Sequence, residues 1–385
     1  MWKLDISHKH LRLSIRTPLH YYHQILVRMT ATTFSQFNGD TEGLEVAQAF
    51  SEQVSGKVVL VTGVNRGGIG YSTAEALASQ GPSHLIITGR SRTKLQESVD
   101  ALKSLYPTVN YVIIQFDLSS QQSVRAAAAE LLGRDDIPKI DLLINNAGVA
   151  FLPEHTYSPE KIEMHFATNH IGHFLFTSLI LPKLIKATEE SPKGATRIIN
   201  VSSGSPKWAY MRWSDINFEK KNKDLPEEER PSYDVHRAWG SLNVEELSYI
   251  PLAAYNQSKV ANVLFSIGAN KRWYERYGIL SLAVFPGWIE TELGRHMPSE
   301  VREAIAKVGN QRGVKYKTLQ AGGSTTVVAA LDPKLGPGEK REGKQNYGVF
   351  LEDCQICSGA HPKAESDEEA EKLWELSEKL ISETS

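Results

Sequence analysis

The sequence predicts a doubly wound α/β domain, in which a Rossmann-type parallel sheet carries helices on both faces. Short apolar runs rich in β-branched residues, such as residues 58–61, alternate with segments of helical periodicity. Polar or glycine-rich stretches follow these runs, beginning with residues 62–70. Strands that alternate with helices of this length form right-handed βαβ units, and such units build a parallel sheet.

The expected elements begin at residue 57. Strands are predicted at residues 58–61, 85–88, 111–116, 140–144, 197–201, 279–285 and 346–351. Helices are predicted at 69–79 and 93–105, after Ser119, from Ser158 and Pro159, and from Ser366 to about Ile381. Ser119 and Ser366 each stand three residues before a Gln or Glu, which is the capping-box pattern, and serine followed by proline is typical of a helix start.

One domain is expected over residues 29–385, with a cofactor half over about 57–201 and a substrate half over about 202–385. Residues 1–28 are basic and are left out of the fold prediction. We interpret them as a disordered tail or an over-extended start, with a transit peptide as the alternative.

Residues 204–254 interrupt the alternation of strands and helices. They are polar and charged but contain Trp208, Trp213, Tyr233 and Trp239. So long an irregular segment in a compact domain is usually functional or disordered. We expect this insertion to cover the substrate side, and its aromatic residues favour a bulky, apolar substrate of polyketide or isoprenoid type.

Composition excludes several classes of protein. The chain has 385 residues, 41% of them hydrophobic, and a formal net charge of -2, so no basic surplus indicates nucleic acid binding. No stretch approaches the ~20 apolar residues of a membrane span. The cysteines, Cys354 and Cys357, cannot build a disulfide framework, which favours a reducing, cytoplasmic location, although targeting to an organelle by residues 1–28 is not excluded. We interpret their C-x-x-C spacing as structural, because zinc would need two further ligands, and we expect no metal.

Glycines between the first strand and the first helix predict a phosphate site. The stretch runs from Thr62 through Gly63, Gly67 and Gly68 to Gly70. Glycines at this place allow a tight turn and a close approach of a pyrophosphate to helix N–H groups. The strand–turn–helix context is the one that a dinucleotide-binding motif requires.

The end of the second strand indicates the choice between NADP and NAD. NAD-binding folds usually place an acid there, but this chain has Arg90 and no acid. Arg90, helped by Arg66 in the glycine loop, could bind a 2′-phosphate. We therefore expect NADP, and NAD is the less favoured alternative.

Tyr255 and Lys259 are four residues apart and share one face of a predicted helix. An ammonium beside a phenol favours the phenolate and lowers the tyrosine pKa, which would make a general acid/base. The spacing also occurs by chance on many helices.

Two other polar stretches follow predicted strands, at the edge where open α/β sheets bind ligands. They are Asn145 to Gly148 and Ser202-Ser203.

Together these motifs resemble the short-chain dehydrogenase/reductase family, from about Lys57 to about Leu293. The matching stretches are Thr62 to Gly70, Asp117-Leu118, Asn145 to Gly148, Asn169, Ser203, Tyr255 with Lys259, and Pro286-Gly287. Residues 254–259 and the C-terminal tail are similar to the retinol dehydrogenase and WW-domain-oxidoreductase branch, without a WW domain. The glycine loop has one extra residue, which leaves open whether Gly67 or Gly68 approaches the phosphate.

The resemblance implies a role for each matching residue. Tyr255 would be the acid/base, Lys259 would lower its pKa and hold the ribose, Ser203 would bind the substrate oxygen, and Asn169 would hold a water that links Lys259 to solvent. Asp117 would contact the adenine. The implied cofactor contacts are Gly63, Asn65, Arg66, Gly68, Ile69, Gly70, Arg90, Asp117, Leu118, Asn145, Ala147, Gly148, Tyr255, Lys259, Pro286, Gly287, Ile289 and Thr291.

The resemblance implies an oxidoreductase that interconverts a ketone or aldehyde with an alcohol. We expect its partner to be a small apolar molecule, with a homo-oligomer as one arrangement of the protein. A protein that senses NADP(H), or a scaffold on the same fold, is the alternative. His165, His170 and His173 are interpreted as packing residues, because no acidic ligands accompany them. Trp288 together with residues 293–316 is interpreted as a mobile lid over the substrate, with a surface subdomain as the alternative.

Overall fold

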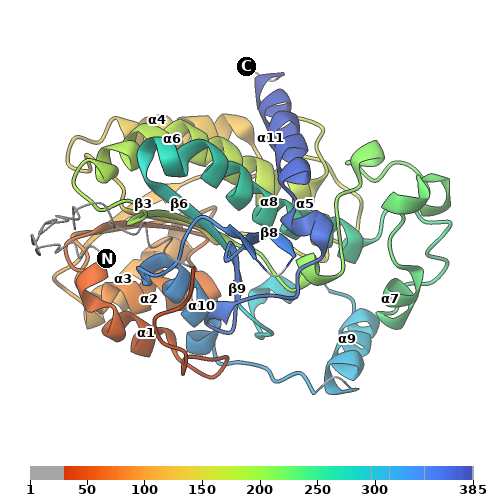
Figure 1. Cartoon of the computed structure of the whole chain (residues 1–385), viewed down its shortest axis with the longest axis horizontal. Helices are drawn as coiled ribbons and strands as arrows, with labels where there is room; N and C mark the ends of the chain where they lie inside the picture. The colour runs from red at the N-terminus through yellow and green to blue at the C-terminus, as the bar shows by residue number, and fades with distance from the viewer. Residues whose placement is uncertain (1–29, 296, 312, 342, 384–385) are drawn as a thin grey trace, which may run out of the picture.

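A largely parallel sheet forms the centre of the structure, as the alternation of elements predicted (Figure 1). The computed structural model describes residues 30–295, 297–311, 313–341 and 343–383, so the predicted tail 1–28 lies outside the described residues. The strands are β1 (Val58–Thr62), β2 (His84–Gly89), β3 (Asn110–Gln115), β4 (Leu142–Asn145), β5 (Thr196–Val201), β6 (Ile279–Phe285), β9 (Phe350–Glu352) and β10 (Gln355–Ile356). Their order is β10-β9-β6-β5-β4-β1-β2-β3, and β10 alone among them runs antiparallel to its neighbour.

Helices cover both faces of this sheet, which confirms the doubly wound arrangement. One face carries α1 (Gly43–Ala49), α2 (Ile69–Ala78), α3 (Arg92–Leu105) and α10 (Leu319–Leu331). The other carries α4 (Gln121–Leu132), α6 (Gly172–Thr188), α8 (Pro251–Tyr277) and α11 (Asp367–Ser382). The strand order reverses between β1 and β4, and open α/β sheets bind ligands at such a switch point, beyond the carboxyl ends of the strands.

The strands are buried because helices lie on both sides of them. Every residue of β1, β5 and β6 is buried, which explains the largely apolar sequences of β1 and β6. Strand β5 also buries the polar side chains of Arg197 and Asn200. Alternate residues of β1 divide between the two layers: Val59 and Val61 pack toward α2 and α10, whereas Val58 and Leu60 pack toward α4 and α6.

Two predicted helix starts are wrong. Ser158 does not cap a helix; its Oγ accepts the N–H groups of Glu160 and Ile162 in a turn. The helical chain begins instead at α5 (Met164–Phe166), where the Glu163 carboxylate accepts two backbone N–H groups. Ser119 likewise donates to Asp117, and Ser120 caps α4. In both places a neighbouring polar side chain competes for the cap, and sequence spacing does not decide such local competition.

The C-terminal part also differs from its prediction in detail. The expected strand at 346–351 is two strands, β8 (Lys344–Tyr347) and β9, separated by a turn at Gly348. Strand β8 pairs with β7 (Glu339–Arg341) in a separate hairpin. Ser366 caps α11, as predicted.

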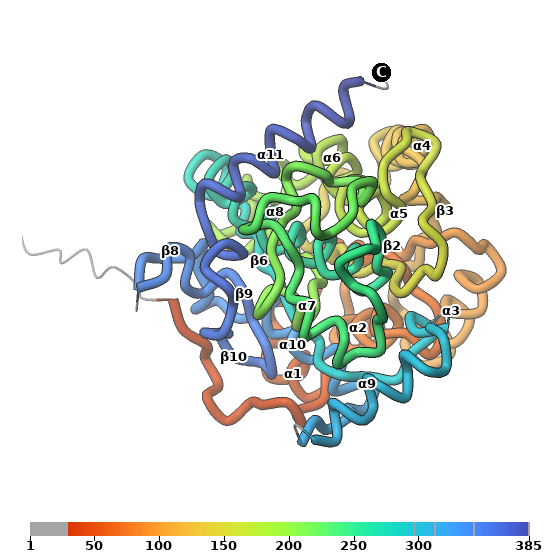
Figure 2. Tube along the Cα trace, turned by 90° about the vertical axis from the view of Figure 1, so that its right-hand side faces the viewer, coloured from red at the N-terminus to blue at the C-terminus, as the bar shows by residue number. Residues whose placement is uncertain are grey.

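The N-terminal described segment runs along the β10 edge of the sheet (Figure 2). Gln355 in β10 donates its side-chain amide to the carbonyl groups of Phe34 (3.0 Å) and Phe37 (2.7 Å). Cys354 and Cys357 flank this short strand; both are buried free thiols, and burial raises the pKa of Cys357 to about 11. A thiol with a raised pKa is a poor nucleophile, so this setting supports the structural interpretation of the C-x-x-C.

Among the described residues, no helix is both long and apolar enough to cross a membrane.

Candidate active site

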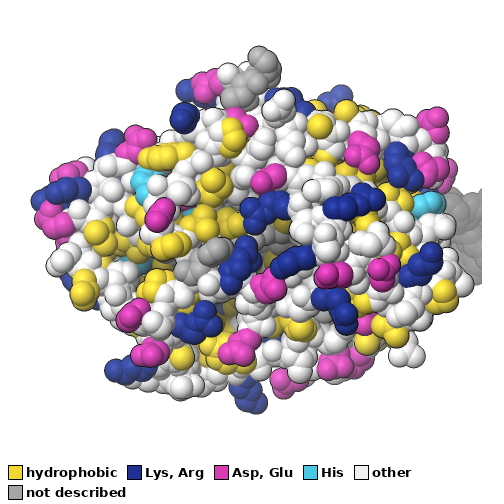
Figure 3. Space-filling model, turned by 180° about the vertical axis from the view of Figure 1, so that it is seen from behind, with side chains coloured by type: hydrophobic (Ala, Val, Ile, Leu, Met, Phe, Trp, Pro, Cys, Tyr) yellow, Lys and Arg dark blue, Asp and Glu magenta, His cyan; other side chains and the backbone are white. Residues whose placement is uncertain are grey.

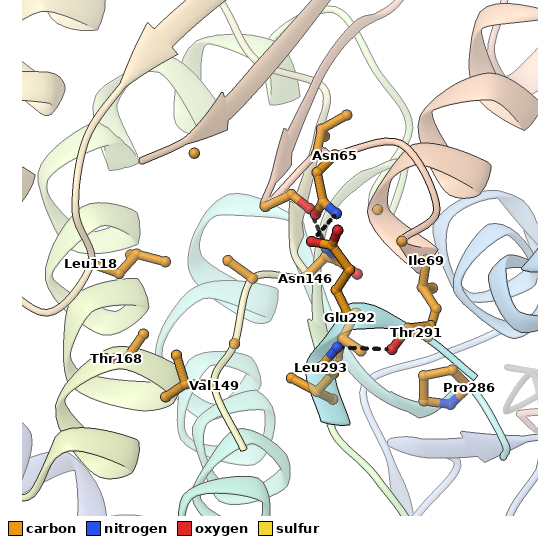
Figure 4. A pocket seen from close by; sticks show the side chains of 18 of the residues that line it. Asn65, Ile69, Leu118, Asn146, Val149, Thr168, Pro286, Thr291, Glu292 and Leu293 are labelled. Atoms are coloured by element: carbon orange, nitrogen blue, oxygen red, sulfur yellow. Dashed lines mark hydrogen bonds between the residues drawn. The ribbon is translucent and has the colours of Figure 1, made fainter. Parts of the chain in front are cut away.

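A pocket of about 620 Å³ lies at the carboxyl ends of the strands, where the strand order reverses. Figure 3 shows a hollow on this side of the molecule, bordered by basic side chains, with hydrophobic side chains gathered beside it. In the close view, Leu118, Thr168 and Val149 line one wall, and Asn65, Ile69 and Thr291 line the opposite wall (Figure 4).

The glycine loop forms the floor of the pocket because side chains would not fit there. A Cβ on Gly63 would lie 2.6 Å from Cα of Ala147, so this glycine lets the loops after β1 and β4 touch. A Cβ on Gly70 would lie 2.6 Å from the Gly63 carbonyl oxygen. Helix α2 begins just after Gly68, and no described side chain caps its N–H groups. Uncapped N–H groups at a helix start suit a phosphate.

The two candidate glycines of the loop have different conformations. Gly67 has φ +80°, and among the described residues nothing lies within 4 Å of where a Cβ would stand, so it serves the left-handed turn. Gly68 is extended and lines the pocket as the N-cap of α2. The geometry therefore favours Gly68 for the approach to phosphate.

The far end of the pocket is basic. Arg90, Ser91 and Lys94 line it, whereas Arg66 does not. Sequence reasoning missed Lys94, although its place in the first turn of the helix after Arg90 could have indicated it. Lys94 forms an exposed ion pair of 3.0 Å with Glu292, which also lies 3.4 Å from the Asn65 side chain (Figure 4).

Tyr255, Ser203 and Lys259 meet at the other end of the pocket. All three line it, and Tyr255 and Lys259 lie in the first turns of α8, as their spacing predicted. Lys259 Nζ lies 5.7 Å from the centre of the Tyr255 ring and donates to the Val201 carbonyl at 3.0 Å. Both serines of the pair line the pocket, but the Ser202 hydroxyl donates to the backbone of Lys259 at 2.7 Å, whereas the Ser203 side chain lies near the Tyr255 hydroxyl.

Burial sets the proton affinities of this group. It raises the pKa of Tyr255 to about 12, an effect that the nearby Ser203 hydroxyl opposes, and lowers the pKa of Lys259 to about 8. The pKa of Tyr255 was expected to fall but is raised instead. Burial destabilises the phenolate more than the ammonium of Lys259 stabilises it at this distance. At neutral pH the phenol keeps its proton.

Asn169 lies at a π-helical turn, Ala167–Ile171, directly before α6. It does not line the pocket but sits behind Gly148: its Oδ1 accepts the Val149 N–H at 2.8 Å, and its Nδ2 donates to Ser258 at 2.9 Å. Its backbone carbonyl accepts from His173 Nδ1 at 3.1 Å. Asn169 therefore joins the loop after β4 to α8.

Most residues predicted to contact a cofactor do line the pocket. The exceptions are Arg66 and Asn145. Asn145 points toward α6 and β5, where its amide donates to Thr177 and Asn200. The next residue, Asn146, lines the pocket instead and donates to the Thr62 carbonyl at 2.8 Å. A strand alternates its side chains, so a shift of one residue exchanges the core face for the ligand face.

A hydrophobic cluster rich in aromatic side chains contains Tyr255. Phe151 stacks on its ring at a centroid distance of 5.6 Å, and Trp239 contacts both Trp208 and Trp288 at about 6 Å. Tyr255, Trp239 and Ile305 belong to one buried cluster, to which α7 (Tyr233–Ala238) and α9 (Ser299–Gln311) both contribute.

Trp213 was expected to join this group but lies elsewhere. Its indole N–H donates to Glu369 of α11 at 2.7 Å. Trp288, which sequence reasoning assigned to the lid, takes its place in the aromatic cluster.

The three histidines are held by protein groups. His165 bonds Glu163 at 2.7 Å, His170 bonds Ser377 at 2.7 Å, and His173 bonds Thr62 at 2.8 Å. Burial lowers the pKa of His173 to about 4, so it stays neutral.

The fold and this site define a Rossmann-type oxidoreductase. The family described as short chain dehydrogenase matches residues 57–215. Oxidoreductase fscI of Fusarium equiseti is 41% identical over 251 residues, which are 65% of this chain and 94% of the relative. Retinol dehydrogenase 14 of Mus musculus is 32% identical over 338 residues, 85% of this chain and 86% of the relative.

A similar fold occurs in the crystal structure of NADPH-bound carbonyl reductase from chicken fatty liver. That protein is 24% identical in sequence, and the likeness covers 78% of this chain and 97% of that one, with a TM-score of 0.50. The chain belongs to the short-chain dehydrogenase family.

The glycine loop generates a stability prediction. Gly63→Ala combines φ +71° with a backbone clash at 2.6 Å, whereas Gly67→Ala meets φ +80° in open space. We expect Gly67→Ala to cost about 1–2 kcal/mol from backbone strain and Gly63→Ala to cost more. Urea unfolding of both variants measures the difference, and equal losses would contradict the close contact with Ala147.

Proposed function

We propose that the protein is an NADP-dependent oxidoreductase that interconverts a ketone or aldehyde with an alcohol on an apolar substrate. The observation that carries this proposal is the meeting of Tyr255, Ser203 and Lys259 at one end of a pocket whose other end is built from a glycine loop and basic side chains.

The residues present fit NADP. Gly63, Gly68 and Gly70 line the pocket without side chains, and the uncapped start of α2 offers N–H groups to the pyrophosphate. Arg90 and Lys94 would hold the 2′-phosphate. The NADPH bound by the chicken carbonyl reductase supports this choice. When bound, the nicotinamide would supply or accept the hydride.

Tyr255 would move the proton. Its raised pKa keeps the phenol protonated at neutral pH, so in reduction it can donate to the oxygen of the carbonyl. Lys259 is mostly an ammonium below its pKa of about 8, and its charge would stabilise the phenolate that remains. Ser203 would donate a hydrogen bond to the same substrate oxygen.

Replacing Tyr255 tests the proposed chemistry. Tyr255→Phe removes the proton but keeps the ring that stacks on Phe151. We expect turnover to fall by about 10²-fold or more, with NADPH binding unchanged when measured by calorimetry. A variant that keeps its turnover would contradict the role of Tyr255. A wild-type protein that binds NADPH but turns over no carbonyl would favour the sensor or scaffold alternative.

Arg90→Ala tests the cofactor. Loss of a charge-assisted bond to phosphate costs about 1.5–3 kcal/mol, so NADPH should bind roughly 10–100-fold more weakly while NADH binding stays unchanged. Lys103→Ala is the matched control, because Lys103 is an exposed cation on α3 that does not line the pocket. An equal loss for NADPH and NADH would refute the 2′-phosphate contact.

The aromatic cluster predicts the substrate class. Phe151, Trp208, Trp239 and Trp288 belong to the hydrophobic cluster that contains Tyr255. In a series of ketones followed by NADPH absorbance, kcat/KM should rise with the size of the apolar group, by about tenfold for two added methylenes. Preference for small charged ketones would overturn this part of the proposal.

A further inference from the structure

We infer that Ser205 and Asn256 form a positioning pair that holds the hydroxyl proton of Ser203 away from Tyr255 and so keeps Tyr255 in the role of an acid. The inference rests on the proposed function, since it assigns the setting of that same site. Ser205 opens the long insertion, and Asn256 follows Tyr255 directly in α8.

The pair forms a short hydrogen-bonded chain. Ser203 Oγ donates to Ser205 Oγ at 2.7 Å, and Ser205 Oγ donates to Asn256 Oδ1 at 2.7 Å. The backbone N–H of Ser205 also donates to Ser203 Oγ at 3.1 Å. Ser205 and Asn256 are buried, with 2% and 3% of their surface exposed, so solvent does not compete for these bonds.

The direction of the hydrogen bonds follows from Asn256, the last residue of the series. An amide oxygen can only accept, so the proton of Ser205 belongs to its bond with Asn256. Ser205 can then meet Ser203 only as an acceptor. The single proton of Ser203 therefore lies in the bond to Ser205 and is withheld from the Tyr255 oxygen.

This arrangement bears on the chemistry of Tyr255. A hydrogen bond donated by Ser203 favours the phenolate and lowers the pKa of Tyr255. Because Ser205 competes for that proton, the phenolate is less favoured than it would be without Ser205. The substrate oxygen must likewise draw the proton of Ser203 away from Ser205.

The other titratable groups near Tyr255 remain in place when this pair is changed. Lys259 faces it from α8, and His165, bonded to Glu163, lies against its ring from the α5 side at 6.4 Å. Arg295 and Glu292 line the same pocket. The chain from Ser203 through Ser205 to Asn256 itself contains only neutral side chains, so changing it leaves these charges as they are.

The test is the pH profile of alcohol oxidation by the full chain with NADP, using a series of benzylic and allylic secondary alcohols. Oxidation needs the phenolate, so its rate rises with pH toward the pKa of Tyr255. In Ser205→Ala the Ser203 proton is released to Tyr255, and we expect the rising limb to move to lower pH by up to about one unit, the effect of one neutral hydrogen bond.

Matched variants separate this role from loss of packing. Ser205→Thr keeps the hydroxyl and should keep the wild-type profile. Asn256→Leu frees the Ser205 proton to bond Ser203, so it should shift the limb in the same direction as Ser205→Ala, and the double variant should shift it no further, because both act through one bond.

The possible results of this test distinguish a failure of the positioning pair from a failure of the proposed function. A limb that stays in place or moves to higher pH in Ser205→Ala, with Tyr255→Phe inactive, would overturn the positioning pair and leave the proposed function standing. Wild-type protein that oxidises none of the alcohols, or a Tyr255→Phe variant that still does, would overturn the proposed function and this inference with it.

Discussion

The burial of residues 255–259 in α8 is the constraint on which the site depends. Between Tyr255 and Lys259 every side chain is buried, and each of the three intervening residues bonds a different part of the chain. Asn256 accepts from Ser205, Gln257 bonds Arg212 and Ile216 in the insertion, and Ser258 accepts from Asn169. Because these residues are consecutive on one helix, any movement of the insertion or of the loop after β4 would also move Tyr255.

A second set of contacts joins the Tyr255 end of the pocket to the glycine loop. Thr62, at the end of β1, accepts the N–H groups of Asn146 and Ala147 at 2.9 and 3.0 Å and bonds His173 at 2.8 Å. His173 in turn donates to the carbonyl of Asn169. A neutral, buried histidine suits this place, because a charge there would lie close to Lys259. Buried polar contacts thus connect the glycine-loop end of the pocket with its Tyr255 end.

Burial also explains why the tyrosine and the lysine differ from their ordinary behaviour. The same removal from water raises the pKa of Tyr255 and lowers that of Lys259, so both neutral forms are favoured. A protonated phenol beside a lysine that is readily charged is an arrangement ready to give a proton. The aromatic side chains of the same cluster, Phe151 among them, help to exclude water from Tyr255.

The sequence by itself determined the alternation of strands and helices, the glycine loop and the spacing of Tyr255 and Lys259, because each depends on contacts within one short segment. It did not determine the helix start at Met164, where Glu163 caps the helix and Ser158 instead forms a turn. Nor did it determine that Asn146 rather than Asn145 faces the pocket, or that Trp213 turns toward α11.

Only the tertiary structure decided the direction of the pKa shift in Tyr255 and the bond that links Ser203 through Ser205 to Asn256. The reason is physical: desolvation and the sharing of one hydroxyl proton depend on which distant segments exclude water and compete for the same atom. The insertion, which in sequence only separated Ser203 from Tyr255, is the segment that does both.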